Sequence, residues 1–552
     1  MKKYIGIAVV VTLVALGFRL GLALRYPNDA PDDGRLYAQI ARNVLNHGSY
    51  STATEAPHPP TLIRVPGYPL FLAGVYKIFA QDNHRAVRVI QAVIDTATCW
   101  LIALLAFAWS PAEWSPEKRR RATLMALTLA STCPFVAIYV TTMLTEICTT
   151  FFLALFALAA TLALKNENRW GSAAWWMASG LVGGMATMFR PDSGIFVIAA
   201  GVTLVIVGLP RSLNAWRDSR SGDFKNEWLS RDVANTLICV VMLSVGMACV
   251  LAPWTIRNAR LFGRFQPIAP IYAKMPGEFV PHGYYLWLRT WVGHSRYVET
   301  FQFPLDTRPI RLENAPASAF DSPEERARVA ELFDRYHKKP SPPPRAIRAS
   351  RHAESGRAGS GDDLKGETAG EEESIDQHGS SKGSESSGES RGKANVAMTR
   401  DVDADFGEIA RGRIARHPVR YYVVLPFKRV LTVWFDNRSQ YYPFEGNLLP
   451  FSRLDHETHQ QYWLPLFAAL VWTYTSLAVI GCWVMWRRED SRRWVLFLAL
   501  LILPRLALLS TLENPEPRYA VQYFALLVAA GALPIATISL RHIGNALPVW
   551  RA

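Results

Sequence analysis

The chain has 552 residues, of which 50% are hydrophobic and 12% are aromatic. This amount of apolar and aromatic material excludes an ordinary soluble protein and indicates a polytopic membrane protein. The net charge of +14 does not indicate nucleic-acid binding, because the basic residues lie mostly in short loops beside apolar segments, where they orient a chain in the bilayer.

The N-terminus begins with Met1-Lys2-Lys3, followed by an apolar run over residues 5–24 that is long enough to cross a bilayer. A secretion signal and a permanent membrane helix both fit this pattern. We favour the membrane helix, with its basic end in the cytoplasm. Residues 25–85 then form the first external loop. Its apolar piece, residues 70–79, is too short to cross, so it is expected to dip into the membrane or to lie flat.

The first external loop contains a predicted amphipathic helix over residues 32–47. The sequence Pro-Asp-Asp at residues 31–33 can cap its start, apolar residues recur at helical spacing, and His47-Gly48 can end it. Asp33 and Tyr37 are four residues apart, so they share one face of the helix. At this point the two acids, Asp32 and Asp33, fit either helix capping or a chemical role.

Nine further apolar segments follow, so the sequence predicts roughly ten or more transmembrane helices. These segments are residues 87–109, 122–140, 147–164, 173–189, 194–209, 233–252, 464–486, 495–509 and 521–540. Alternating them from a cytoplasmic N-terminus assigns the short basic loops to the cytoplasm, as the positive-inside rule requires.

This topology divides the chain into three parts. Residues 1–253 form an N-terminal transmembrane module that carries the first external loop, residues 254–462 form a small external domain, and residues 463–552 form the C-terminal transmembrane helices. Within the external region, about residues 338–400 are rich in Ser, Gly, Glu and Pro, which is typical of a disordered insertion. All six cysteines lie in apolar runs and are interpreted as packing residues.

Polar motifs from distant loops fall on the external side of this topology. Each has a simple structural explanation when it is taken alone, such as an interfacial carboxylate or a snorkelling arginine. Asp95, inside the second span, is interpreted as a paired structural residue. The joint occurrence of the external motifs nevertheless predicts a functional site. Its candidate residues are Asp32, Asp33, Tyr37, Arg64, Glu146, Arg190, Arg257, Arg518 and Tyr519.

Glycosyl transfer from a lipid phosphate sugar needs both positively and negatively charged side chains at a membrane surface. Guanidinium groups stabilise the departing phosphate, and an apolar groove between helices accommodates the polyprenyl tail. A carboxylate such as Asp33 or Asp32 can take the proton of the acceptor hydroxyl. The donor is already activated, and the sequence has no glycine-rich phosphate signature.

The order of these motifs along the chain, and their shared position on the external side of the membrane, resemble those of the GT-C integral membrane glycosyltransferases. The narrower resemblance is to the bacterial group related to protein O-mannosyltransferases and to the aminoarabinose transferase acting on lipid A. The motifs that carry it are Asp33-x-x-x-Tyr37-x-x-x-Ala41, Arg64-x-Pro-Gly-Tyr-Pro69, Thr145-Glu146, Arg190-Pro191-Asp192, Pro253-Trp254 with Arg257-Asn258, and Pro517-Arg518-Tyr519. The doubled acid and the long polar insertion depart from the family pattern.

The resemblance implies an all-α GT-C-like helical bundle with a small external domain. It also implies that Asp33, with Asp32 as its rival, is the catalytic base and that Glu146 is a second acid that positions a substrate. The expected donor-phosphate ligands are Arg190, Arg257 and Arg518. The expected substrate contacts are Tyr37, Arg64 and Tyr519. No cofactor is required; the external acids could hold a divalent metal, although no ligand spacing indicates one.

We therefore predict an inverting glycosyltransferase of the cytoplasmic (inner) membrane whose active site faces the periplasm or exterior. It would move a hexose or pentose from a polyprenyl-phosphate donor to a glycan, lipid or protein acceptor. Inversion follows from a single displacement that needs one base. The alternative is a transporter or lipid flippase. Such proteins tend to show internal repeats and ionisable residues near the bilayer midplane, whereas here the charges gather at one face.

Overall fold

The computed structural model describes residues 2–27, 32–218, 225–338, 396–435 and 460–537, and every regular element among them is helical. The N-terminal elements are α1 (Lys2–Arg25), α2 (Asp32–His47), α3 (Gly67–Phe79), α4 (His84–Trp109), α5 (Pro116–Thr132), α6 (Pro134–Ala137), η1 (Ile138–Thr141), α7 (Glu146–Lys165), α8 (Arg169–Phe189), η2 (Pro191–Ser193), α9 (Gly194–Asp218) and α10 (Lys225–Phe262). The elements of the region predicted to be external, called the external elements below, are α11 (His282–Arg289), α12 (Ser295–Phe301), η3 (Leu312–Asn314), η4 (Ala317–Ala319), α13 (Pro323–His337), α14 (Arg400–Arg416), η5 (Arg420–Val424) and α15 (Leu425–Phe435). The C-terminal elements are α16 (Gln460–Trp486), α17 (Glu489–Thr511), η7 (Pro517–Tyr519) and α18 (Val521–Thr537).

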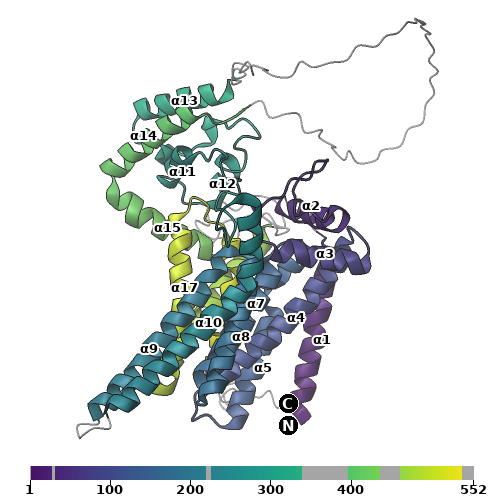
Figure 1. Ribbon diagram of the computed structural model, residues 1–552, viewed down its shortest axis with the longest axis vertical. Helices are drawn as coiled ribbons and strands as arrows, with labels where there is room; N and C mark the ends of the chain where they lie inside the picture. The colour runs from purple at the N-terminus through teal and green to yellow at the C-terminus, as the bar shows by residue number, and fades with distance from the viewer. Residues whose placement is uncertain (1, 28–31, 219–224, 339–395, 436–459, 538–552) are drawn as a thin grey trace, which may run out of the picture.

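The long helices form one bundle, with α11 to α14 at one end and α2 and α3 lying across the same end (Figure 1). Seven described helices are long and apolar enough to cross a membrane, and α5 with α6 and η1 forms a further span bent by 44°. Helix α8 packs between α7 and α10, and α18 packs against α16 and α5. The other two predicted spans fall on α8 and on the shorter apolar helix α18, which are not among these seven helices. The prediction of a polytopic helical membrane protein is confirmed.

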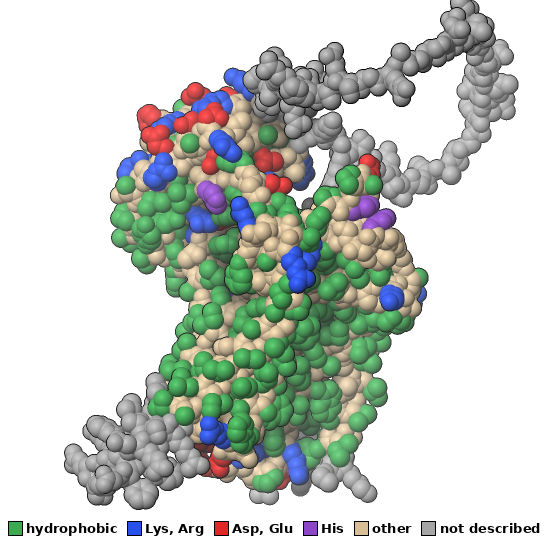
Figure 2. Space-filling view, in the orientation of Figure 1, with side chains coloured by type: hydrophobic (Ala, Val, Ile, Leu, Met, Phe, Trp, Pro, Cys, Tyr) green, Lys and Arg blue, Asp and Glu red, His purple; other side chains and the backbone are tan. Residues whose placement is uncertain are grey.

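The surface of the bundle agrees with this fold. Figure 2 shows apolar side chains covering its sides, while charged side chains gather toward its two ends. An apolar belt of this kind is what a protein exposes to the hydrocarbon core of a bilayer. The short apolar helix α3 lies at the external end of the bundle, as its length predicted.

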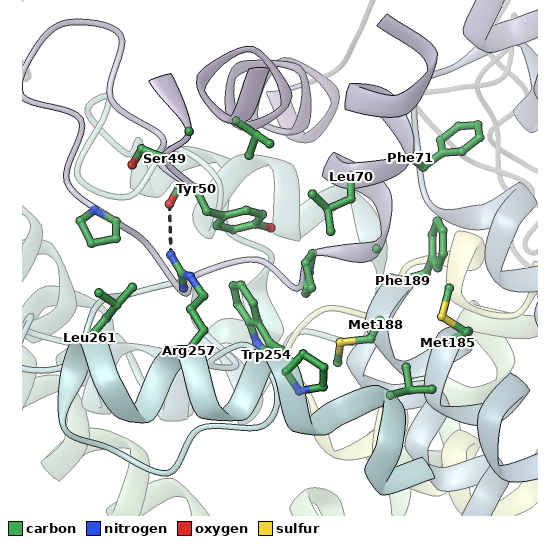
Figure 3. Close-up of a pocket in the computed structure, with 17 residues that line it drawn as sticks. Ser49, Tyr50, Leu70, Phe71, Met185, Met188, Phe189, Trp254, Arg257 and Leu261 are labelled. Atoms are coloured by element: carbon green, nitrogen blue, oxygen red, sulfur yellow. Dashed lines mark hydrogen bonds between the residues drawn. The ribbon is translucent and has the colours of Figure 1, made fainter. Parts of the chain in front are cut away.

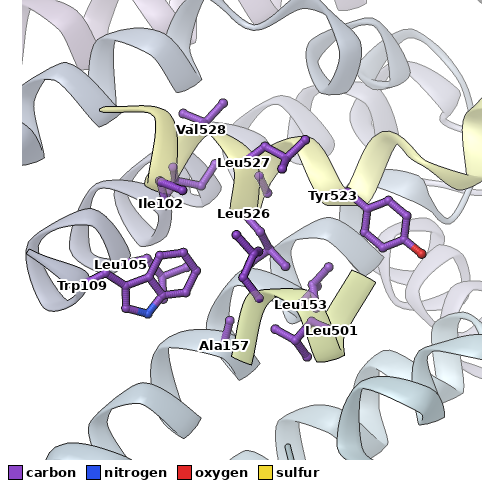
Figure 4. Packing of buried hydrophobic residues seen from close by; sticks show 14 of the residues in the cluster. Ile102, Leu105, Trp109, Leu153, Ala157, Leu501, Tyr523, Leu526, Leu527 and Val528 are labelled. Atoms are coloured by element: carbon purple, nitrogen blue, oxygen red, sulfur yellow. The ribbon is translucent and has the colours of Figure 1, made fainter. Parts of the chain in front are cut away.

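The main core joins helices from both ends of the chain. Trp109 of α4, Leu153 of α7, Leu501 of α17 and Leu526 of α18 are all buried in one cluster (Figure 4). Elsewhere α8 and α10 approach so closely that a Cβ atom at Gly180 would lie 2.1 Å from the carbonyl oxygen of Leu243. Small residues allow such close helix packing within membranes, where dispersion contacts take the place of the hydrophobic effect.

A buried ion pair joins α1 to α4 inside the bundle. The Nε atom of Arg19 donates to Oδ2 of Asp95 at 2.5 Å, and both side chains are almost fully buried. The Nη atoms of Arg19 also donate to the carbonyl oxygens of Ala130 and Ser131 at the end of α5. Pro134 has no N–H to offer the carbonyl of Ala130, so Arg19 replaces the hydrogen bond that the helix loses there. The interpretation of Asp95 as a paired structural residue is confirmed.

The external helices α11 to α14 have a separate aromatic core that contains Tyr284, Trp287 and Phe406. Most of the predicted insertion, about residues 338–400, lies outside the described residues. Its C-terminal edge was placed wrongly, because Val396 and Met398 are buried in this core.

The end of the seventh span was also predicted wrongly. Helix α10 continues through Pro253 to Phe262, well beyond the expected domain boundary at residue 253. A proline removes one helix hydrogen bond, whereas Trp254 and Asn258 gain burial in the two turns that follow it. The division of the chain at residues 253 and 463 remains a proposal. All six cysteines are free, and four of them are buried.

The ion pair between Arg19 and Asp95 gives a stability prediction. Asp95→Leu should destabilise the protein by about 3–5 kcal/mol, because it leaves a buried guanidinium without its counter-ion. The double variant Arg19→Met/Asp95→Leu should be less destabilised than Asp95→Leu alone. Thermal unfolding of the wild type, of the single variants Asp95→Leu and Arg19→Met, and of the double variant in one detergent measures the coupling, and purely additive losses would contradict the pairing.

Candidate active site

Asp33, in the first turn of α2, lies between two arginines from distant loops. Its Oδ1 atom accepts from Nη2 of Arg64 at 2.9 Å, and its Oδ2 atom accepts from Nη1 of Arg518 at 3.4 Å. Burial alone would raise the pKa of Asp33, but Arg518 and Arg64 together hold it below its ordinary value. The predicted meeting of the first and last external loops is thereby confirmed.

Asp32 is the first residue of α2, and its side chain lies outside the described part of the chain. Its rivalry with Asp33 for the role of base therefore stays a prediction. Asp33 is the acid for which contacts with the other candidate residues can be described.

Tyr37 lies one turn after Asp33 and packs edge to face against Tyr68 of α3, with ring centroids 5.2 Å apart. Burial raises the pKa of Tyr37 to about 12, and the nearby charge of Asp33 adds to this effect, so the phenol stays protonated. The hydroxyl of Tyr68 donates to Gln91 at 2.7 Å, and Gln91 donates to the carbonyl of Thr142 at 2.7 Å. These bonds fix α3 against α4 and the segment before α7.

The glycine of the Arg-x-Pro-Gly-Tyr-Pro motif has a packing role. A Cβ atom at Gly67 would lie 2.5 Å from the carbonyl oxygen of Met188, at the end of α8. Only a residue without a side chain lets α3 begin this close to α8. The motif thus brings Arg64 to Asp33 through a backbone contact with the bundle.

A second group of charges lies at the external ends of α7 and α8. Glu146 begins α7 and is buried, and its Oε1 atom accepts from Nη1 of Arg190 at 3.2 Å. Arg190 also donates to Asp192 at 3.1 Å. Asp192 in turn accepts from Nε of Arg505 at 2.9 Å. The Oε2 atom of Glu146 is buried without a hydrogen-bond partner among the described residues.

Tyr519 connects the two groups of charges. Its ring lies 4.5 Å from the guanidinium carbon of Arg190 and 5.3 Å from that of Arg518. Its carbonyl oxygen accepts from Nη1 of Arg505 at 2.7 Å. The aromatic face is attractive to both cations, so it holds two like charges near one another. Seven of the predicted residues form one contiguous site, which is called the charged cluster below. They are Asp33, Tyr37, Arg64, Glu146, Arg190, Arg518 and Tyr519.

Two residues that contact the charged cluster were not among the predicted site residues. Glu516 is largely buried, with Oε2 at 2.6 Å from Nε of Arg518. Burial raises the pKa of Glu516; Arg518 opposes this shift, while Asp33 and Glu146 add to it. Arg505 is fully buried within α17 and was counted as part of an apolar span. A charged residue inside such a span is a signal of function or pairing that could have identified it.

Arg257 was predicted to bind the donor phosphate together with Arg190 and Arg518, and this role stays a prediction. Its guanidinium donates to the carbonyl oxygen of Thr61 at 2.9 Å and lies over the rings of Trp254 and Tyr50 at 4.7 and 5.2 Å (Figure 3). Helix α10 extends beyond Pro253 and places Arg257 at the rim of an apolar cavity.

This apolar cavity has a volume of about 960 Å³ and lies between α3, α8 and α10 (Figure 3). Its lining is almost entirely apolar, and Arg257 is the only charged residue in it. The lining residues are Val44, Gly48, Ser49, Tyr50, Pro60, Pro66, Gly67, Leu70, Phe71, Met185, Met188, Phe189, Val250, Pro253, Trp254, Arg257 and Leu261. Among the described residues Arg257 has no carboxylate partner, whereas Arg64, Arg190, Arg505 and Arg518 each have one.

One short segment separates the apolar cavity from the charged cluster. The side chain of Arg64 is directed to Asp33, while Pro66 and Gly67 line the cavity. The hydroxyl of Tyr50 donates to the carbonyl oxygens of Arg64 and Val65 at 3.2 and 3.1 Å, which fixes this segment from the cavity side. Within the described ranges, no group of three or more His, Cys, Asp or Glu side chains is arranged to hold a metal ion.

Comparison with known proteins agrees with the resemblance of the motifs. Residues 58–216 match the family model for dolichyl-phosphate-mannose-protein mannosyltransferase, and this stretch contains Arg64, Glu146 and Arg190. The match confirms the resemblance to protein mannosyltransferases over that part of the chain. No curated protein sequence matches the chain.

Searches of solved structures find the archaeal oligosaccharyltransferase AglB from Archaeoglobus fulgidus, in complex with an inhibitory peptide and a dolichol-phosphate. The identity is 12% and the TM-score 0.41, and the match covers 100% of this chain and 52% of that one. The chain thus spans about half the length of that protein. ArnT from Cupriavidus metallidurans matches in its apo state with 14% identity and a TM-score of 0.34, and bound to undecaprenyl phosphate with 13% identity and a TM-score of 0.33. Both ArnT matches cover 96% of this chain and 77% of the other.

The close approach at Gly67 gives a prediction with an internal control. Gly67→Ala should destabilise the protein by about 1–3 kcal/mol and lower activity, because the new methyl group must displace the backbone of α8. Gly74→Ala, in the same helix, meets no atom within 4 Å and should leave stability unchanged or raise it slightly. Thermal unfolding compares the two variants; equal behaviour would contradict a packing role for Gly67.

Proposed function

We propose that the chain is a glycosyltransferase that moves a sugar from a polyprenyl-phosphate donor to an acceptor at the outer face of the membrane. The observation that carries this proposal is the contact of Asp33 with Arg64 and Arg518 beside an apolar cavity whose single charge is Arg257. A base, cationic groups and an apolar binding site for a lipid tail are the parts that this reaction needs. The family match over residues 58–216 supports the same reaction class.

The donor phosphate is assigned to Arg257. A half-buried guanidinium without a carboxylate partner is an incomplete ion pair, and a lipid phosphate would complete it with charge-assisted hydrogen bonds. The polyprenyl tail would lie against the apolar side chains that line the cavity, which include Leu70 and Met188. Leu70 and Met185 are exposed at the surface of the bundle, so a lipid has a path to the cavity.

Asp33 is assigned the role of base in a single displacement. The acceptor oxygen attacks the anomeric carbon, the bond from that carbon to the phosphate oxygen breaks, and the phosphate leaves with the bonding electrons. Asp33 takes the proton of the acceptor hydroxyl, and the configuration at the anomeric carbon is inverted. Arg64 and Arg518 keep Asp33 ionised.

The remaining residues of the charged cluster would hold the sugars. The unpaired Oε2 atom of Glu146 can accept a hydrogen bond from a sugar hydroxyl, in keeping with its predicted positioning role. Tyr37, protonated at neutral pH, can donate one, and the ring of Tyr519 offers a flat apolar face. The sugar is a hexose or pentose, and the acceptor is a glycan, a lipid or a protein.

The proposed location is the cytoplasmic membrane, with the charged cluster on the outside. Arg488 pairs with Glu113, and Tyr4 near the start of α1 donates to Glu117, so these loops share the end of the bundle at which α1 begins. The basic loops of the chain gather at this end, which the positive-inside rule assigns to the cytoplasm. The pairing of Asp95 with Arg19 gives that intramembrane acid a structural explanation, so it offers no support to the transporter alternative.

The role of Asp33 can be tested directly. Asp33→Asn should keep the fold and lower the transfer rate by about 10²–10⁴-fold, because the amide cannot accept the proton. Membranes supplied with a radiolabelled polyprenyl-phosphate sugar measure the transfer. Asp82→Asn, a partly exposed acid that pairs with Arg42, should retain activity and serves as the control. Full activity of Asp33→Asn would remove the proposed base.

The role of Arg257 makes a separate prediction about binding. Arg257→Met should weaken the binding of undecaprenyl phosphate by about 10- to 100-fold, which is the loss expected for charge-assisted hydrogen bonds. Arg260→Met, an exposed arginine one turn further along α10, should bind the lipid normally. Titration of the purified proteins in nanodiscs measures both affinities. Unchanged binding by Arg257→Met would assign the phosphate to another arginine.

A further inference from the structure

The loop over residues 512–520 joins α17 to α18 and carries Glu516, Arg518 and Tyr519 into the charged cluster. The first part of this loop is bound by residues of the external helices. Nε of Arg289, the last residue of α11, donates to Oε2 of Glu513 at 2.7 Å, and Glu513 is almost fully buried. Arg289 is itself held from the other side, because its Nη2 atom donates to the hydroxyl of Tyr272 at 2.5 Å.

A second arginine binds the same region, where the external helices meet the end of α17. Arg429 of α15 is 1% exposed and donates to the carbonyl oxygens of Val292, Arg289 and Ser510, at 2.8, 2.5 and 3.1 Å. The hydroxyl of Thr432, one turn along α15, donates to the carbonyl oxygen of Gly293 at 2.7 Å. Figure 1 shows α15 beside the external end of α17.

Among the described residues no salt bridge joins Arg429 to a carboxylate; burial lowers its pKa to about 10, although the charge of the nearby Glu513 opposes this shift. A buried guanidinium without a counter-ion is tolerated only while its N–H groups are hydrogen-bonded. Its three carbonyl partners come from the end of α11 and from the end of α17. Separating these ends would leave the charge unsatisfied, so the segment 289–293 and the end of α17 are expected to move as one body.

We propose that Arg289 and Glu513 are positioning residues that let the external domain set the place of the 512–520 loop, and with it the place of Arg518 and Tyr519. This inference rests on the proposed function for its effect on the reaction rate. The distance from Arg518 to Asp33 is 3.4 Å, compared with 2.9 Å from Arg64 to Asp33, so a small shift of the loop changes the weaker of the two contacts. The external domain therefore acts on the charged cluster through this loop, and the charge of Glu299, on α12, also raises the pKa of Glu516 in the same loop.

The test uses the full chain in nanodiscs and the variants Glu513→Gln and Arg289→Met, alone and together. Glu313→Gln, an exposed acid of the external domain, is the matched control. Each single variant should lower kcat by about 10- to 100-fold, since a displacement of about 1 Å has this effect on a reacting geometry. The binding of undecaprenyl phosphate should change by less than about twofold, and the double variant should lose no more activity than either single variant.

Amide hydrogen exchange provides a readout that does not depend on activity. In Glu513→Gln, exchange of the 512–520 loop should become faster, while α11 to α14 keep their protection. Unchanged loop exchange, or faster exchange throughout the external domain with a matching fall in the unfolding temperature, would overturn the proposal. If Asp33→Asn were active while the loop still responded to Glu513→Gln, the proposed function would fail and the positioning role would stand.

Discussion

The pairing of charges away from water is the constraint on which this structure depends. Asp33 is held by Arg64 from the same external loop and by Arg518 from the far end of the chain. The side chain of Asp33 is 30% exposed, and those of Arg64 and Arg518 are 25% and 11% exposed, so pairing these partly buried charges requires all three residues to reach the same place. The contact thus closes the site and also brings the first and last external loops together above the bundle.

The parts of the fold that depend on local pattern could be predicted from the sequence. The spans follow from apolar runs of sufficient length, and the helix that carries Asp33 follows from apolar residues at helical spacing and from the stop at Gly48, whose φ of 62° suits glycine. The prediction that Asp33 and Arg518 lie on the same side of the membrane follows from counting the spans between them. These inferences succeed because each depends on solvent exposure along a short segment.

The partners of individual side chains could not be predicted in this way. Arg505 looked like part of an apolar span, and its pairing with Asp192 depends on the packing of α17 against α9. Arg257 was grouped with Arg190 and Arg518 because all three follow spans that end on the same predicted side of the membrane. In the structure Arg257 lies on the continuing helix α10, at the rim of the apolar cavity. Such errors arise where tertiary contacts outweigh a local rule, here the rule that proline ends a helix.

The ion pair of Arg19 with Asp95 also constrains how the protein is made. The two residues are 76 positions apart, so the ribosome completes α1 well before the carboxylate that neutralises its arginine. A lone guanidinium is costly in hydrocarbon, and a long side chain avoids the cost by reaching toward the headgroups. The newly made α1 is therefore expected to stay shifted toward one leaflet, or against the translocon. It can settle to its final depth only when α4 and α5 have been synthesised and enclose it.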